Sequence, residues 1–351
     1  MGLAELRVEN VRCIEFAELS LHPGCNLICG GNGAGKTSLL EAVFLLGRGR
    51  SFRTRHSGPV IRHGVERMTV FGRCESGPHA MGVEFDRRGR AQARVNGRHL
   101  GSLAELTLTL PVQVIDPEIH KLVEEGSRRR RRWLDWMVFH VEPRFGGWWV
   151  RYARALRQRN AALKSRAVDA RPWEFELTDA GEHIAEARRA AMDALQTHWR
   201  QVIAALGCPE ADLHYARGWT NQSSLQDALH ASRARDELRQ LTHPGPHRAD
   251  VVIQISGRPA REVLSRGQQK LMAAALILAQ LRLLKDGSGL TPALLLDDPA
   301  AELDAEHLVA FVEDVSRLDC QIIATSLHPD IPGFKAPDRV FHVEQGRVRT
   351  V

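Results

Sequence analysis

The chain has 351 residues, of which 43% are hydrophobic and 26% charged, as is typical of a soluble globular protein with room for two compact units. Its net charge is +6, and 42 of its 48 basic residues are arginine. This excess favours a polyanionic partner, although a biased genomic base composition would produce it too. Aromatic residues make up only 6%, which argues against base stacking on single strands and favours contacts to a duplex backbone.

Cysteine usage and hydropathy exclude several classes of protein. The six cysteines contain no C-x-x-C pair, which excludes a zinc hook or ribbon of the usual spacing and indicates reduced thiols. Glu5, Arg7 and Glu9 interrupt the apolar run that a signal peptide needs. The most apolar helix that we expect, at 271–284, is too short and too polar to span a bilayer. We therefore expect a cytoplasmic protein with no membrane partner.

The first half of a nucleotide site follows a short apolar strand at 25–29. The loop after this strand matches the phosphate-binding pattern G-x-x-x-x-G-K-[ST], and a helix is expected from Ser38 onward. Backbone N–H groups and the helix dipole would surround the phosphates, and the Thr37 hydroxyl would bind Mg²⁺. A glycine-rich turn that binds nothing is disfavoured because motif and context agree. The loop residues are Gly30, Gly31, Asn32, Gly33, Ala34, Gly35, Lys36 and Thr37.

Residues 1–115 otherwise predict strands and hairpins around that helix. Asn96-Gly97 is typical of a two-residue β-hairpin turn. A basic loop after the phosphate helix would lie where a dimer could form a DNA cleft. Its arginines are Arg48, Arg50, Arg53 and Arg55.

From Pro117 to about residue 207 the chain predicts arginine-rich helices with few glycines. Apolar residues recur every seven positions, and Pro172 would divide them into an antiparallel helix pair. The pattern fits either a short coiled-coil-like arm or an ordinary helical bundle. The two series are Trp149, Leu156 and Leu163, then Leu177, Ile184, Ala191, Leu195 and Val202.

Two charged segments leave alternatives open. The five consecutive arginines at 128–132 either grip DNA phosphates or line a solvated helix face, which is the commoner use of a charge run. His247 and Arg248, in the stretch G-P-H-R-A-D at 245–250, either position the segment that follows or form a plain turn.

The second half of the site lies near the other end of the chain. At 264–270, L-S-R-G-Q-Q-K opens a long apolar helix, where Ser265 and Gly267 would make a second anion site; alone, the motif also fits an ordinary N-capped helix. An apolar run then ends in Asp297-Asp298, 261 residues after Lys36. The ends of the chain therefore join in one head, and two heads would sandwich two nucleotides.

This ordered set resembles the ABC-type ATPases of the structural-maintenance and repair branch, and within them the RecF family of bacterial recombination and gap repair. The resemblance covers nearly the whole chain. It implies an α/β fold, an ABC-type ATPase head of mixed sheets with a P-loop core and an inserted α-helical, coiled-coil-like arm. The head halves would be 1–115 and 246–351, and the inserted lobe 116–245. The matching segments are 6–12, 26–37, 47–53, 131–135, 245–250, 264–270, 296–298 and 302–304.

The resemblance also implies roles for individual residues. Lys36 and Thr37 would hold phosphate and Mg²⁺, Asp297 would be the second magnesium ligand, and Asp298 would replace the usual catalytic Glu. Because Asp is shorter by one methylene, we expect slow hydrolysis. Ser326 stands where many ABC ATPases carry a switch histidine, and His328 follows two residues later. The remaining implied contacts to nucleotide, several across the dimer, are Ser265, Gly267, Gln268, the D-loop residue Asp304 and the Q-loop candidate Gln113.

The implied function is an ATP-gated homodimer on DNA that hydrolyses ATP slowly. The implied partners are RecR and RecO, with delivery of RecA to gapped DNA and roles in replication restart and SOS induction. A chromosome-tethering protein like a miniature condensin is a second hypothesis, which the short arm disfavours. A transporter ATPase subunit is a third, which the helical insert and the missing switch histidine disfavour.

Overall fold

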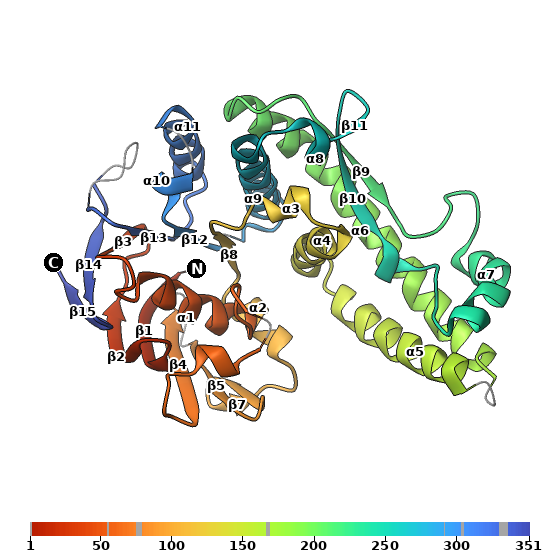
Figure 1. The fold of residues 1–351 in the computed structure, drawn as a ribbon, viewed down its shortest axis with the longest axis horizontal. Helices are drawn as coiled ribbons and strands as arrows, with labels where there is room; N and C mark the ends of the chain where they lie inside the picture. Colours follow the sequence, from red (N-terminus) through yellow and green to blue (C-terminus); the bar gives the residue numbers. More distant parts are fainter. Residues whose placement is uncertain are drawn as a thin grey trace. The chain divides into compact units, whose positions relative to one another are not determined.

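The computed structural model describes residues 2–54, 56–74, 79–165, 169–290, 292–302, 305–329 and 336–351, with the elements labelled in Figure 1. By their internal contacts the residues form two compact units. The first unit comprises 1–119, 205–207 and 274–351, and the second comprises 120–204 and 208–273.

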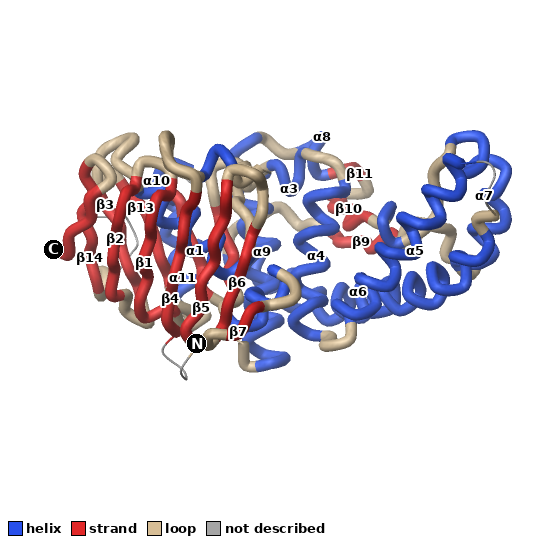
Figure 2. Tube along the Cα trace, turned by 90° about the horizontal axis from the view of Figure 1, so that it is seen from below, coloured by secondary structure: helices blue, strands red, loops and turns tan. Residues whose placement is uncertain are grey.

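An antiparallel sheet of six strands forms one layer of the first unit, in the order β2-β1-β4-β5-β6-β7 (Figure 2). Residues alternate along β1, so that Leu6 and Val8 are buried while Arg7 is exposed. Asn96 and Gly97 join β6 to β7 with φ of 49° and 78°, which confirms the predicted hairpin turn. The strands are β1 (Leu3–Val11), β2 (Ile14–Ser20), β4 (Arg67–Cys74), β5 (Ala80–Asp86), β6 (Ala91–Val95) and β7 (Arg98–His99).

A second six-stranded sheet in the same unit has the order β15-β14-β3-β13-β12-β8. Its strands pair in parallel except β15, which is antiparallel to β14. Because β13 lies between β3 and β12, the two ends of the chain build one sheet, as expected. The strands are β3 (Cys25–Cys29), β8 (Val112–Ile115), β12 (Ala293–Asp297), β13 (Ile322–Ser326), β14 (Arg339–Glu344) and β15 (Arg347–Thr350).

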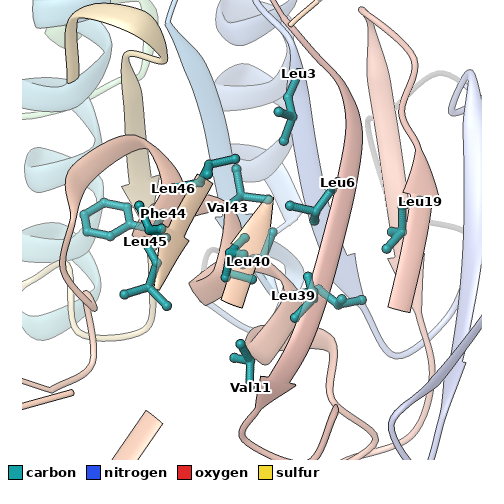
Figure 3. Close-up of a cluster of buried hydrophobic side chains, with 14 of the residues drawn as sticks. Leu3, Leu6, Val11, Leu19, Leu39, Leu40, Val43, Phe44, Leu45 and Leu46 are labelled. Atoms are coloured by element: carbon teal, nitrogen blue, oxygen red, sulfur yellow. The ribbon is translucent and has the colours of Figure 1, made fainter. Parts of the chain in front are cut away.

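Helix α1 (Lys36–Arg48) contacts strands of both sheets and carries most of its side chains into the core. Leu39 and Leu40 are fully buried and share a hydrophobic cluster with Leu3 and Leu6 of the antiparallel sheet (Figure 3). Burial of one such leucine contributes about 1.5–3 kcal/mol, so the helix that follows the phosphate loop is firmly held. The unit also contains α2 (Leu106–Thr109), the later part of α9 (Arg266–Ser288), α10 (Pro299–Glu302) and α11 (Ala305–Ser316).

The second unit is mainly helical, and α5 and α6 form the expected antiparallel pair. Arg151 of α5 bonds Glu176 and Asp179 of α6, whereas Arg159, later on α5, bonds Glu174, which is earlier on α6, as an antiparallel arrangement requires. Pro172 lies in a short 3₁₀ turn between the two helices. The helices are α3 (Lys121–Glu124), α4 (Ser127–Val141), α5 (Phe145–Ser165), α6 (Glu174–Ala205), α7 (Leu225–Arg239) and α8 (Ala260–Val263).

The predicted sevenfold seam holds on α6 but is displaced on α5. Leu177, Ile184, Ala191, Leu195 and Val202 of α6 are all buried. On α5, by contrast, Trp149 and Leu156 are only half-buried. The displacement arises because α5 also contacts α7 and is not packed on α6 alone. The side chains that α5 buries are Phe145, Tyr152, Ala155, Arg159, Ala162 and Leu163.

A small antiparallel sheet in the order β11-β10-β9 completes the second unit. Strand β10 (Asp250–Ile255) pairs with β9 (Asp212–Ala216) and with β11 (Arg258–Pro259). Residues 246–273 therefore cluster with the helical lobe, whereas the sequence analysis placed 246 onward in the ATPase head. The strand pairing to β9 is the physical reason for this difference.

All six cysteines are free, and burial raises the pKa of Cys208 and Cys320 to about 12, so both thiols stay protonated at neutral pH. In the part of the chain that the structure describes, no group of three His, Cys, Asp or Glu side chains could hold a metal ion. Within that same part, every helix is too short or too polar to cross a membrane.

Candidate nucleotide-binding site

Glycines shape the loop between β3 and α1. Gly30, Gly33 and Gly35 have φ of 154°, 74° and 119°, a region that other residues rarely adopt. A Cβ on Gly30 would lie 2.2 Å from the carbonyl oxygen of Val343. The loop can therefore run against β14 only with glycine at that position.

The side chain of Lys36 folds back onto this loop. Its Nζ donates hydrogen bonds to the carbonyl oxygens of Gly30 at 2.7 Å and Gly31 at 3.0 Å. The backbone N–H of Gly346 bonds the Ala34 carbonyl oxygen at 2.8 Å and holds the far side of the loop. Since an ammonium group has three N–H donors, Lys36 can keep these contacts and still bind a phosphate oxygen.

Thr37 and Asp297 bring the two predicted halves of the site together. The Thr37 hydroxyl donates to Asp297 Oδ1 at 2.9 Å. This contact arises because β3 and β12 both flank β13, so their carboxyl ends meet at one edge of the sheet. Mg²⁺ prefers oxygen ligands such as hydroxyl and carboxylate groups, so the side chains of Thr37 and Asp297 fit a magnesium ion.

Asp298 follows directly at the same edge. Its φ is 50°, a left-handed conformation that Asp tolerates better than most residues. Its backbone N–H donates to the Thr325 hydroxyl at 3.0 Å. The structure therefore places Asp298 directly beside Asp297, at the edge of the sheet where the phosphate loop begins.

At the switch position, Ser326 is the last residue of β13 and pairs with Cys29, directly before the phosphate loop. Its hydroxyl accepts a hydrogen bond from the backbone N–H of His328 at 3.3 Å. Ser326 is buried, whereas His328 is exposed. Ser326 is therefore the polar side chain that the sheet itself holds beside the loop.

Gln113, the Q-loop candidate, is buried and makes its hydrogen bond within the first unit. It lies inside β8, paired with Leu294, three residues before Asp297 on the neighbouring strand. Its buried amide donates to Gln280 Oε1 at 2.5 Å. The side chain thus serves the core of the first unit, and the structure does not bring it to the phosphate loop.

Residues 264–270, here called the signature segment, belong to the second unit and begin α9. Gln268 Oε1 accepts from the backbone N–H of Ser265 at 3.0 Å, and the Gln268 N–H reaches the Ser265 hydroxyl at 3.4 Å. This reciprocal pair is a capping box, as in the simpler interpretation of the motif. Ser265, Gly267 and Gln268 are all exposed, so the positive end of the helix remains open to an anion. Asp304 and Arg55 lie outside the described residues.

The five arginines at 128–132 differ in their contacts and exposure. Arg130 is buried and donates two hydrogen bonds to Asp250, at 2.8 and 3.0 Å, besides three to backbone carbonyls. Arg131 bonds the Ala249 carbonyl oxygen at 2.6 Å, and Arg129 pairs with Glu125. Arg128 is exposed. Neither predicted role therefore describes Arg130, which joins α4 to β10.

A buried carboxylate anchors the basic loop after α1. Glu41 is fully buried and receives two hydrogen bonds from Arg12, at 2.8 and 2.9 Å. Ser51 also donates to Glu41, and Arg53 lies 3.9 Å from it. Of the predicted basic residues, Arg50 is exposed while Arg48 lies over the Phe44 ring. The sequence does not predict this role of Glu41, because a polar residue on a helix gives no sign that it is buried.

The G-P-H-R-A-D segment is tied into the helical unit. The His247 ring bonds the Tyr152 hydroxyl at 2.6 Å and the Thr242 carbonyl oxygen at 3.0 Å. Arg188 donates to the Pro246 carbonyl oxygen at 2.8 Å and pairs with Asp135. This segment is therefore a packed junction before β10 and not a plain surface turn.

Comparison with known proteins gives one consistent result. Residues 2–349 match the RecF/RecN/SMC N terminal domain family. The DNA replication and repair protein RecF of Stutzerimonas stutzeri is 40% identical, covering 99% of this chain and 97% of that protein. RecF of a Shewanella species is 36% identical over the full length of both.

Solved structures agree with the sequence matches. The solved structure of RecF-ATP, a recombination mediator protein of the RecFOR pathway, superimposes on this chain with a TM-score of 0.88 at 26% identity. The match covers 99% of this chain and 97% of that one. An Smc head bound to a domain of ScpA has a TM-score of 0.61 at 14% identity, which shows a shared fold.

Proposed function

The chain belongs to the RecF family of ABC/SMC-type ATPases, and we propose that it is an ATP-gated, DNA-binding homodimer of recombinational gap repair. ATP binding would close two heads on two nucleotides and create a basic surface for duplex DNA. Slow, DNA-dependent hydrolysis would open the dimer again. We further propose that it works at the nucleoid with RecO and RecR, helps to load RecA, and supports replication restart and SOS induction.

The observation that supports this proposal is that each unit contains a helix start suited to bind phosphate. Lys36 begins α1 behind the glycine-rich loop, and Ser265 caps α9 with its neighbours exposed. In a head-to-head dimer, the loop of one copy and Ser265 of the other would contact the same γ-phosphate.

The chain's own residues account for the proposed chemistry. Thr37 and Asp297 would hold Mg²⁺, which when bound neutralises charge on the β- and γ-phosphates. Lys36 would bind the same phosphates, and Asp298 would orient the attacking water. Because Asp298 is shorter than the usual Glu, we propose that turnover is slow.

The dimer is tested by measuring molar mass with light scattering, with and without Mg²⁺ and ATP. We expect the 39.2 kDa chain to double in mass with ATP, and Ser265→Arg to stay monomeric. Ser224→Arg is a matched control, since Ser224 caps α7 through the same kind of capping box. Each substitution costs about 1 kcal/mol of helix capping. A monomer under every condition, or loss of the dimer in both variants, would contradict the proposal.

The gating step is tested on DNA. Affinity for duplex DNA is measured with and without ATP, over a range of salt concentrations, for wild type and Lys36→Arg. We expect ATP to increase the affinity of wild type, with a steep salt dependence that reports phosphate contacts. A Lys36→Arg variant that still dimerises tightly on DNA with ATP would rule out the gating model.

A further inference from the structure

One hydroxyl lies between the two acidic residues of the nucleotide site. Thr325 is in β13, the strand next to β12, and its side chain is fully buried. The strand register pairs Thr325 with Asp297. Nothing in the sequence predicts a role for this residue, because threonine is common in apolar strands.

The Thr325 hydroxyl makes a different hydrogen bond to each acidic residue. It donates to Asp297 Oδ1 at 2.8 Å. It also accepts from the backbone N–H of Asp298 at 3.0 Å. A hydroxyl has one proton and two lone pairs, so it can satisfy both partners at once. No apolar side chain of the same shape could do this.

The first of these bonds orients the carboxylate. Asp297 Oδ1 accepts from Thr325 and also from Thr37, at 2.8 and 2.9 Å. Two donors on one oxygen define the rotation of the carboxylate. If the Thr37 hydroxyl held a metal ion through its oxygen, Thr325 would still donate to Asp297.

The second bond acts on the backbone. Asp298 has φ of 50°, a conformation that residues other than glycine adopt at a cost. The bond from its N–H to Thr325 offsets part of this cost and sets the direction in which the Asp298 side chain leaves the strand. Thr325 therefore acts on a magnesium ligand and on the residue proposed to orient water.

We propose that Thr325 is a positioning residue for this ATPase, which aligns Asp297 for the metal ion and Asp298 for the attacking water through its single hydroxyl. The proposal rests on the proposed function of the site, and it adds a residue that would act through its hydrogen bonds to Asp297 and Asp298. Replacing a residue that hydrogen-bonds a metal ligand typically lowers metal affinity or activity by about 10- to 100-fold.

The experiment compares Thr325→Val, which keeps the shape and removes the hydroxyl, with Thr325→Ser, which keeps the hydroxyl. Thr107→Val is the matched control, because Thr107 is buried in the same unit and its hydroxyl bonds the Gly47 carbonyl oxygen at 3.2 Å. Binding of a fluorescent ATP analogue is measured in Mg²⁺ and in EDTA. Turnover at saturating ATP and thermal unfolding without nucleotide are measured in parallel.

We expect Thr325→Val to weaken binding in Mg²⁺ by about tenfold while binding in EDTA stays within about twofold of wild type. Turnover should fall by at least about tenfold, and Thr325→Ser should restore most of both losses. Thr107→Val should change neither the binding in Mg²⁺ relative to EDTA nor the turnover. Equal loss of binding in Mg²⁺ and in EDTA, or wild-type behaviour of Thr325→Val, would overturn the proposal. A wild-type protein that binds Mg²⁺-ATP without dimerising would contradict the proposed function and leave this assignment standing.

Discussion

Arg130 and Asp250 lie 120 positions apart in the sequence and share two hydrogen bonds, at 2.8 and 3.0 Å. The pair joins α4 to the first residue of β10, the strand that leads through β11 and α8 to Ser265. The run of arginines thus contributes one residue to the interior of the unit that carries the signature segment.

Replacing Arg130 should therefore affect stability more than DNA binding. The Arg130 side chain is 10% exposed, so Arg130→Met leaves the Asp250 charge without its partner and should cost about 3–5 kcal/mol of unfolding free energy. Arg128→Met, two positions earlier on the exposed face, should stay within about 0.5 kcal/mol. Urea unfolding of both variants gives the comparison. Equal stability of the two would contradict a structural role for Arg130.

Glu41 should hold the basic loop in place. Glu41→Gln removes the negative charge of the carboxylate that accepts hydrogen bonds from Arg12 and Ser51. We expect the free energy of unfolding to fall by about 3–5 kcal/mol. Trypsin should then cleave after Arg50 and Arg53 faster than in wild type. Glu9→Gln is the control, since Glu9 pairs with Arg7 on the surface and such pairs contribute about 0–1 kcal/mol. An unchanged rate of cleavage in Glu41→Gln would show that the loop is held by other contacts.

Gly30 should tolerate no side chain. In Gly30→Ala the new Cβ would approach the Val343 carbonyl oxygen to 2.2 Å, and the backbone φ of 154° adds strain. We expect a loss of about 2–4 kcal/mol in unfolding without nucleotide. Gly31→Ala is the matched control, because nothing lies within 4 Å of a Cβ there, and it should change stability by less than about 1 kcal/mol. Similar losses in both variants would refute the steric explanation.

The sequence predicted the parts of the site that a motif of fixed spacing defines. The glycine-rich loop forces a strand, a turn and a helix, so Lys36 and Thr37 were placed by chemistry that allows few alternatives. Asp297 followed from an apolar run that ends in two acids. These residues could be predicted without knowing any distant contact, because the carboxyl ends of parallel strands meet at one edge of a sheet.

The residues that the sequence did not predict act through distant partners. Thr325, Glu41 and Arg130 each bond a residue 28 or more positions away, and nothing near them in the chain indicates it. The family resemblance made Gln113 a candidate Q-loop contact, yet the register buries it beside Gln280. Register and burial depend on tertiary packing, which local patterns do not encode.

His247 should make the stability of the protein depend on pH. Burial lowers the pKa of His247 to about 4, from 6.5 in the unfolded chain. The hydrogen bond to the Thr242 carbonyl opposes this shift, as does Asp236 more weakly, while Arg248 and Arg131 add to it. The ring lies between the Tyr152 hydroxyl and a backbone carbonyl oxygen. The neutral form is thus favoured in the folded state, and the unfolded chain binds more protons between pH 4 and 6.5. Stability from this residue is therefore fully present above about pH 6.5 and is lost as the pH falls toward 4.

The expected effect is measured by comparing wild type with His247→Asn in urea at pH 5.0 to 7.5. Around pH 5 the unfolded chain takes up nearly one more proton at this position than the folded one. The difference in unfolding free energy between the two proteins should therefore fall by about 1.2 kcal/mol per pH unit from about pH 6 to 5. His63→Asn, at an exposed position, controls for replacing a histidine by asparagine. Parallel pH profiles of wild type and His247→Asn would mean that the pKa of His247 is the same in the folded and the unfolded protein, so that folding does not favour the neutral ring at the junction with Tyr152.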